Sequence, residues 1–391
     1  MSSTASDAPP AEVDATVVER VRRVDIRRIV LVAVALAMAT VMWSYGRALT
    51  GPGNDALSVR SVEWLKDHHF TWAVNDVERW WYTHHQPKRG GVPTGALAAA
   101  LRPVPTSTTA DPPVASAPAV TVAPAVPPHL PPPRPLAPMA PGAVAGEGQW
   151  KPLGQPVDGV PAMYAAYLRP DPVHTSLVAA VAWMDPTLVR MVGYAGAVEP
   201  GGGPWTEQAP VAEALRPKLL AAFNSGFKMR DARGGYYADG RLARPLVPGG
   251  ATLVIASDGT PNVGEWGRDV QMGPGVAFAR QNLSLIVDAG TPVAGLDTDA
   301  TRRWGYTVGN RVLVWRSGIG VTADGALVYA AGSSISASTL AALLARAGAV
   351  RAMELDINWS WVDFFSYSPT LVPAAPEVNK LLPDMHPSTT D

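Results

Sequence analysis

Three short clusters of polar residues stand among apolar runs in the second half of the chain, and their side chains could carry out chemistry on a sugar or a phosphate. They contain Asn224, Gly226 and Lys228 in FNSGFKM, Arg316, Ser317 and Gly318 in WRSGIGV, and Glu354, Asp356 and Asn358 in MELDINW. Carboxylates act as acid, base or nucleophile at a sugar carbon, and arginine or lysine binds an anion. The clusters therefore favour glycosidic hydrolysis or the binding of an anionic group.

The third cluster alternates polar and apolar side chains. In AMELDINWSW, residues 352–361, Glu354, Asp356 and Asn358 occupy every second position, and large apolar side chains fill the gaps. In a β-strand this spacing places the two acids and the amide on one face. Because acids are poor strand formers, their presence in so apolar a strand makes them candidates for chemistry.

The remaining composition narrows that chemistry. The chain has no cysteine, and His174 is the only histidine between 150 and 382. A thiolate nucleophile, a disulfide framework and a histidine or cysteine metal site are thus excluded, and neither a G-x-S-x-G elbow nor a glycine-rich phosphate loop is present. A net charge of −1 gives no reason to expect nucleic acid as a partner. We expect no metal and no cofactor, although a divalent cation on oxygen ligands stays open.

Each cluster also has a purely structural interpretation. Asn224 is a typical turn residue, Arg316 fits a charged position on the surface of a strand, and Gly318 with Gly320 fits a bulge. Glu354 and Asp356 fit the solvent face of an edge strand. For any one cluster taken by itself, residue type favours the structural interpretation.

The elements that must position these residues belong to a predicted globular domain over 150–382. Short runs rich in Val, Ile, Trp and Tyr, such as ATLVIAS and LSLIVDAG, alternate with glycine turns, which is typical of strands. Asp324–Gly325 between two such runs predicts a hairpin. One helix is clear, SASTLAALLARAG, with Ser336 or Ser338 as its N-cap and Gly348 at its end. We predict one α+β domain of mixed β-sheets with few helices, and not a doubly wound fold.

An apolar segment near the N-terminus predicts a single transmembrane helix over 29–46. Residues 29–45 carry no charge, and five arginines between 20 and 28 precede them. This bias keeps residues 1–28 in the cytoplasm as a tail and places the following chain outside; a cleaved signal peptide is the alternative. Amphipathic runs predict a juxtamembrane helical stalk over 47–101. Fourteen prolines between 102 and 142 predict an extended linker over 102–149, and residues 383–391 form a tail.

Together and in this order, the clusters resemble the phosphodiester glycosidase family, the family of the uncovering enzyme. The resemblance starts at the turn 224–228, continues through 316–321 and the hairpin at 324–325, includes the helix from Thr339, and ends at 355–360. Ile357, Asn358 and Trp359 stand where the family keeps glycines. The anchor and stalk resemble those of a membrane-anchored actinobacterial subgroup.

The resemblance implies a membrane-anchored hydrolase that acts outside the cytoplasm and cleaves a sugar from a glycosyl-1-phosphodiester. On this hypothesis Asp356 is the base or nucleophile with Glu354 assisting, and Arg316, with Lys228 second, neutralises the phosphate. The hypothesis adds a set of residues that would bind sugar hydroxyls or phosphate, namely Asn224, Gly226, Ser317, Gly318 and Asn358.

Two competing functions stay open. A non-catalytic protein of the cell envelope would use the same clusters to bind a glycan, and the altered glycine run favours it. A metal-dependent phosphodiesterase would need a cation held by acids such as Asp288 and Asp356. The sequence leaves the sugar, the stereochemical outcome and the oligomeric state open.

Overall fold

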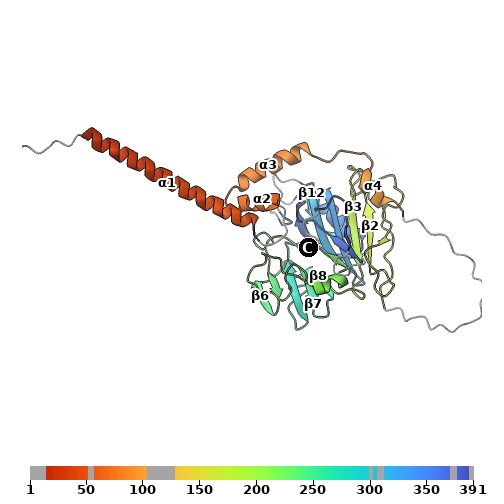
Figure 1. Cartoon of the computed structure of the whole chain (residues 1–391). Helices are drawn as coiled ribbons and strands as arrows, with labels where there is room; N and C mark the ends of the chain where they lie inside the picture. The colour runs from red at the N-terminus through yellow and green to blue at the C-terminus, as the bar shows by residue number, and fades with distance from the viewer. Residues whose placement is uncertain are drawn as a thin grey trace, which may run out of the picture. The chain divides into compact units, whose positions relative to one another are not determined.

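The computed structural model describes residues 15–51, 57–103, 128–298, 303–305, 312–369 and 377–386. The chain forms two compact units. One contains helices α1 (Ala15–Leu49) and α2 (Leu57–Asp67), and the other contains the remaining elements (Figure 1).

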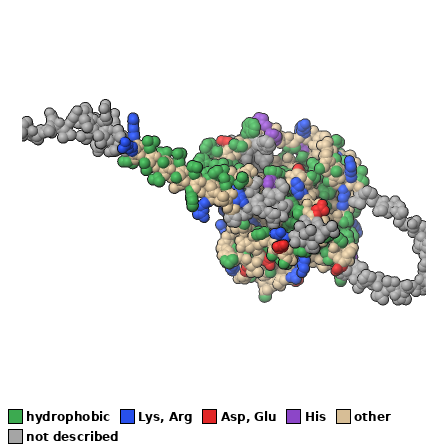
Figure 2. All heavy atoms as spheres, viewed as in Figure 1, with side chains coloured by type: hydrophobic (Ala, Val, Ile, Leu, Met, Phe, Trp, Pro, Cys, Tyr) green, Lys and Arg blue, Asp and Glu red, His purple; other side chains and the backbone are tan. Residues whose placement is uncertain are grey.

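The first unit contains the predicted membrane helix. Within α1, Ile26–Leu49 is long and apolar enough to cross a membrane, and its length and composition also fit a signal anchor. Large side chains such as Leu31 and Met42 are exposed, and Figure 2 shows hydrophobic side chains along this helix. Residues 1–14 of the predicted cytoplasmic tail lie outside the described residues, so the orientation of the helix stays a prediction.

The helices of the second unit are α3 (Thr71–His84), α4 (Gly95–Leu101), α5 (Ala337–Arg346) and the 3-10 helix η1 (Glu213–Lys218). The largest sheet has eight strands in the order β1 (Lys151–Pro152), β2 (Met163–Leu168), β3 (Ala179–Met184), β13 (Leu327–Ile335), β12 (Val314–Thr322), β14 (Ala349–Ile357), β10 (Leu285–Asp288) and β11 (Thr291–Pro292).

Two smaller sheets complete this unit. One has the order β6 (Arg241–Arg244), β5 (Tyr236–Ala238), β9 (Val276–Gln281), β7 (Ala251–Ala256) and β8 (Pro261–Glu265). The other has the order β16 (Glu377–Lys380), β15 (Phe365–Ser368) and β4 (Ala221–Ala222).

The predicted α+β class with few helices is confirmed. Every ladder between the described strands is antiparallel, where the sequence predicted a mixture of strand directions. Some of these pairs are hairpins, since a tight turn joins neighbouring strands only in the antiparallel sense. The turn at Asp324–Gly325 makes one of them, and it joins β12 to β13.

The helix predicted before the last strand of the large sheet is α5. Ser336 is its N-cap, and the Ser336 hydroxyl accepts a hydrogen bond from the Thr339 N–H. Since β13 and β14 pair with β12 from opposite sides, α5 connects two strands across a third. Leu340 and Leu344 of α5 pack with Ala352 against one face of the large sheet. This packing fixes the position of β14.

The five-stranded sheet packs against the other face of the large sheet. Leu253 of β7 and Val263 of β8 share a core with Ile319, Met353 and Leu355. The central strands β12 and β14 are therefore covered on both faces, which explains why both strands carry so many apolar residues.

The second unit extends beyond the predicted boundaries of 150 and 382. Leu101 is 2% exposed and belongs to the main core, although the sequence placed it at the end of a stalk. Glu147, predicted as linker, forms a buried ion pair with Arg169 at 2.8 Å. Met385 and His386 are buried, although both were predicted as tail. The sequence did not indicate these contacts, because they depend on single side chains and not on a periodic pattern. Residues 104–127 and 387–391 lie outside the described residues.

Candidate functional site

The acids of the third cluster lie inside the large sheet. Strand β14 pairs with β12 on one side and with β10 on the other. Glu354 is 0% exposed and Asp356 is 5% exposed, and Met353 and Leu355 beside them are buried as well. The alternative in which these acids form the solvent face of an edge strand is therefore wrong.

A β-bulge separates the two acids. The register of β14 against β12 slips between Glu354 and Ile357, so that Leu355 and Asp356 both lie opposite Ser317. Such a bulge re-aims the side chain of the extra residue, and the Asp356 N–H donates to Ser317 Oγ at 3.1 Å. The predicted common face for Glu354 and Asp356 is wrong, because strict alternation holds only in a strand without a bulge.

Glu354 is committed to an internal ion pair. Arg316 Nη1 donates to Glu354 Oε1 at 2.5 Å, and Arg316 Nε donates to the Ile335 carbonyl at 3.3 Å. The side chains are 6% and 0% exposed. Burial raises the pKa of Glu354, and the charge of Arg316 opposes that rise. The sequence predicts that Arg316 binds a phosphate. In the structure its guanidinium is instead used by Glu354 and the Ile335 carbonyl.

Gly318 serves the packing of β12 and not a ligand. A Cβ at Gly318 would lie 2.9 Å from the Met353 carbonyl oxygen and 3.0 Å from Leu344 Cδ1 of α5. The predicted contact of Gly318 with substrate is therefore blocked by the sheet and by α5.

Replacing Gly318 by Ala tests this packing role. We expect Gly318→Ala to lower the free energy of unfolding by about 1–3 kcal/mol, because an added methyl group overpacks the core. Gly273→Ala is the matched control, since a Cβ at Gly273 meets nothing within 4 Å. Urea titration followed by tryptophan fluorescence measures both. Equal stability of the two variants would contradict the packing role.

Asp356 meets the loop that follows β4. The Gly226 N–H donates to Asp356 Oδ2 at 3.1 Å, and the Asn224 N–H donates to Asp363 Oδ1 at 2.7 Å. The Asn224 amide also donates to the Trp361 carbonyl at 3.1 Å. Two carboxyl groups, from β14 and from the segment before β15, thus hold the backbone of the predicted Asn224–Lys228 turn.

Arg280, at the end of β9, holds the same loop from the other side. Its Nε donates to the Ser225 carbonyl at 2.7 Å, and its Nη2 donates to the carbonyls of Gly226 at 2.9 Å and Phe227 at 2.5 Å. Gly226 has a φ of +120°, and a Cβ there would lie 3.3 Å from Arg280 Nε. Only glycine fits this conformation and this close approach.

Asn282 joins the loop to the bulge. Its Oδ1 accepts from the Phe227 N–H at 3.3 Å, and its Nδ2 donates to the carbonyls of Glu354 at 2.8 Å and Leu355 at 2.9 Å. The site therefore forms where all three sheets meet: the loop after β4, the end of β9 and the bulge in β14.

The environment of Asp356 raises the pKa of its carboxyl group into the range that is useful for catalysis. Burial and the nearby Asp363 raise the pKa of Asp356 to about 7, against the opposing effects of Arg280 and the Gly226 N–H. A carboxyl group that gains and loses its proton near neutral pH is suited to general acid–base catalysis. Arg280 is buried as well, and burial lowers the pKa of its guanidinium.

Of the predicted site residues, the structure brings Asp356, Asn224, Gly226 and Ser317 together. The Lys228 carbonyl accepts from the Ala232 N–H at 2.9 Å, so its backbone belongs to the next turn. Sequence reasoning missed Asp363, Arg280 and Asn282. An acid inside the apolar run WVDFF, and the polar triplet RQN at the end of a strand, were the available signals.

Asn358 has a backbone conformation that favours glycine. Its φ is 133°, a backbone conformation that residues other than glycine rarely adopt. Its N–H donates to the Trp315 carbonyl at 3.2 Å, and its Oδ1 accepts from the Ser360 N–H at 3.2 Å. The chain path after Asp356 is thus one that glycine would adopt without strain.

Replacing Asn358 by Gly should relieve this strain. We expect Asn358→Gly to raise the free energy of unfolding by about 1 kcal/mol, because relief of a strain of about 1–3 kcal/mol outweighs the loss of the hydrogen bond from the Ser360 N–H. Asn358→Ala keeps the Cβ and loses the bond to Ser360, so it should be less stable than wild type. Thermal unfolding measures both. A glycine variant that is less stable than the alanine variant would contradict this account.

Asp288 and Asp356, the two acids considered as ligands of a divalent cation, do not lie together. Asp288 pairs with Arg268 at 2.9 Å, and the preceding Val287 lies opposite Ala352, four positions before Asp356 on β14. Within the described ranges, no group of three or more His, Cys, Asp or Glu residues is placed to hold a metal ion.

Comparisons with known proteins give weak likenesses. No family model matches the chain, and no curated protein matches it. Among solved structures, the catalytic domain of zebrafish N-acetylglucosamine-1-phosphodiester alpha-N-acetylglucosaminidase, auto-inhibited by its pro-peptide, is similar, with 16% identity and a TM-score of 0.38 over 59% of this chain and 79% of that chain. A hypothetical protein from Synechocystis is similar with 13% identity and a TM-score of 0.28 over 52% of this chain and 57% of that chain.

Proposed function

We propose that this protein is a hydrolase that cleaves the bond between a sugar and the phosphate of a glycosyl-1-phosphodiester. The observation that carries the proposal is the pair of carboxyl groups, Asp356 and Asp363, that hold one loop with Arg280 on its other side. The order of the sequence motifs, which resembles that of the phosphodiester glycosidases, supports the same chemistry.

Two carboxyl groups in different protonation states are the usual machinery of glycoside hydrolysis. In this proposal Asp356 is the base or nucleophile at the anomeric carbon, and burial together with the nearby Asp363 keeps the pKa of Asp356 high. A phosphate monoester leaves without full protonation, so a strong general acid is less necessary.

Arg280 takes the role for which the sequence suggested Arg316. The hydrogen bonds that Arg280 makes with described residues use Nε and Nη2. Its Nη1 is then the donor that would approach a phosphate oxygen, since guanidinium groups bind phosphate well. The side-chain amide of Asn224 lies on the same loop and would orient the substrate through its Oδ1, since its Nδ2 donates to the Trp361 carbonyl.

We further propose that α1 anchors the protein in a membrane, with the second unit outside the cytoplasm. The length and apolar character of Ile26–Leu49 support an anchor. Arg27 and Arg28 precede the apolar run, which favours a cytoplasmic N-terminus.

The direct test uses the full-length protein in detergent with two probes, the methyl phosphodiesters of glucose-1-phosphate and of N-acetylglucosamine-1-phosphate. Hydrolysis should release the free sugar and methyl phosphate. In ¹⁸O-labelled water the label should appear in the sugar, because the carbon–oxygen bond breaks. Label in the phosphate would instead indicate a phosphodiesterase, and that result would overturn the proposal.

A glycan-binding protein without activity is the second candidate. The burial of both acids favours it, since Asp356 is 5% exposed and Asp363 is 2% exposed. Calorimetry with the same probes separates the two functions. Binding without any product would support the binding protein and reject the hydrolase.

A further inference from the structure

Helix α2 folds back along the last turns of α1. The Tyr45 hydroxyl of α1 bonds with Ser61 Oγ of α2 at 2.8 Å, and Trp64 Nε1 donates to Ser44 Oγ at 3.0 Å. Further along α2, Trp64 stacks on His68 with ring centroids 4.3 Å apart, and His68 Nε2 lies 3.0 Å from the same Ser44 hydroxyl. The two helices are therefore tied by side chains over several turns.

Arg60 closes this hairpin at the end of α1. Its Nη1 donates to the Leu49 carbonyl at 2.9 Å and to the Gly51 carbonyl at 2.6 Å. The last carbonyls of a helix have no partner within the helix, so a cation from α2 satisfies them and complements the negative end of the helix dipole. The fold-back is thus built into the sequence of both helices.

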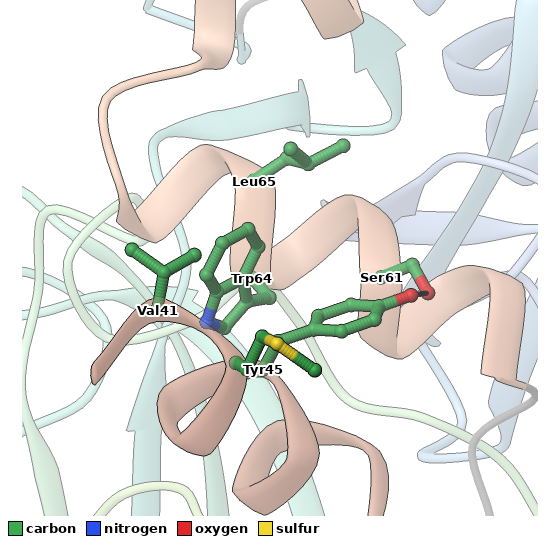
Figure 3. A pocket seen from close by; sticks show the side chains of 6 residues that line it. Val41, Tyr45, Ser61, Trp64 and Leu65 are labelled. Atoms are coloured by element: carbon green, nitrogen blue, oxygen red, sulfur yellow. Dashed lines mark hydrogen bonds between the residues drawn. The ribbon is translucent and has the colours of Figure 1, made fainter. Parts of the chain in front are cut away.

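A hollow of about 280 Å³ lies between the two helices (Figure 3). It is lined by three residues of α1 and three of α2, namely Val41, Met42, Tyr45, Ser61, Trp64 and Leu65. The two hydroxyl groups in this lining bond with each other. The remaining lining is apolar and offers water few partners, so the hollow suits an apolar occupant.

The position of the hollow identifies that occupant. Val41, Met42 and Tyr45 belong to Ile26–Leu49, the stretch that could cross a membrane. Trp43 is 70% exposed at the same level, and exposed Trp and Tyr near the end of a membrane helix mark the interface between lipid and water. Val41 and Met42 lie on the side of Trp43 that faces the apolar run, so the part of a lipid that meets the hollow there is the hydrocarbon of its acyl chain.

We propose that the α1–α2 hairpin is a lipid-binding element, in which α2 packs against the outer end of α1 and the hollow between them holds part of an acyl chain of a bilayer lipid. This inference rests on the proposed membrane anchor and is independent of the proposed hydrolase activity. Such a site would hold the junction between the anchor and the second unit at the membrane surface.

The test is photo-crosslinking of the full-length protein in vesicles of phosphatidylcholine and phosphatidylglycerol that contain phosphatidylcholine with a diazirine in its acyl chain. Mass spectrometry should find lipid adducts on Met42 and Trp64. Leu65→Trp fills the hollow and should abolish the adduct on Trp64. Leu57→Trp, an exposed position of the same helix outside the lining, should keep that adduct.

Adducts along residues 29–38 of α1 report whether this helix lies in the membrane. They therefore distinguish failure of the lipid site from failure of the membrane anchor. Adducts there with none on Trp64, or an adduct on Trp64 that Leu65→Trp leaves unchanged, would overturn the lipid site and keep the anchor. The absence of adducts along the whole of α1 would overturn the anchor and the lipid site together. Hydrolysis of the phosphodiester probes does not enter either result.

Discussion

Asp356→Asn is expected to lower kcat on the glycosyl phosphodiester probes by about 10²–10⁴-fold, the usual contribution of general acid–base catalysis. Asparagine keeps the size of the side chain and can still accept the Gly226 N–H, so the loop should stay in place. Steady-state kinetics of the full-length protein measure the effect. Asp258→Asn is the control, because Asp258 lies at an exposed turn after β7.

The pH dependence of the rate carries the same assignment further. Because burial and Asp363 raise the pKa of Asp356 to about 7, the wild-type rate should change near pH 7. A rate that falls below this pH identifies Asp356 as base or nucleophile, and a rate that falls above it identifies an acid. The residual rate of Asp356→Asn should lack this inflection. An unchanged profile in the variant would exclude Asp356 from the reaction.

The stability of the fold should report the same group with a definite sign. The pKa of Asp356 rises from 3.8 to about 7 on folding, so the folded state holds its proton over a range in which the unfolded state has lost it. The associated stability is fully present below pH 4 and is lost as the pH rises through 7. A shift of this size corresponds to at most about 4 kcal/mol. Urea unfolding at pH 4.5 and 7.5 should show a smaller loss in Asp356→Asn than in wild type.

Arg316→Met should destabilise the protein by about 3–5 kcal/mol, because it leaves Glu354 buried without its cation. The two side chains are almost fully enclosed and are joined at 2.5 Å. Among the described residues Glu354 Oε2 already has no hydrogen-bond partner. Chemical unfolding of the purified variant measures the loss.

The double variant Arg316→Met, Glu354→Met decides whether this pair is structural. Apolar side chains of similar volume often replace a buried ion pair without loss, so the double variant should recover most of the stability. It should also recover binding of the phosphodiester probes. If Arg316 instead bound the phosphate directly, the double variant would regain stability while its KM stayed high.

Sequence reasoning identified residues of the junction between the sheets better than it identified their geometry. The scarcity of histidine and cysteine directed attention to the acids, and Asp356 does lie at the junction of the three sheets. The loop around Asn224 and Gly226 was found from its order in the motif. Both inferences depend on residue type and sequence order, which the sequence contains directly.

The partners of these residues could not be predicted in the same way. The alternation around Glu354 and Asp356 predicted one shared face, but a bulge is a tertiary feature that follows from the register with β12. Arg280 comes from a strand of the five-stranded sheet and Asp363 from the segment before β15, and no local pattern states which sheets meet. The same reason explains why the contacts of Leu101 and Glu147 with the domain were missed.

Because the site is assembled from three sheets, the contacts that form it join residues far apart in the sequence. Gly226 and Asp356 are 130 positions apart in sequence, and Asn224 and Asp363 are 139 apart. Contacts between such distant residues form late, because long loops must close first. Synthesis produces α1 well before Asp363, so the candidate site can be completed only long after α1 has been made.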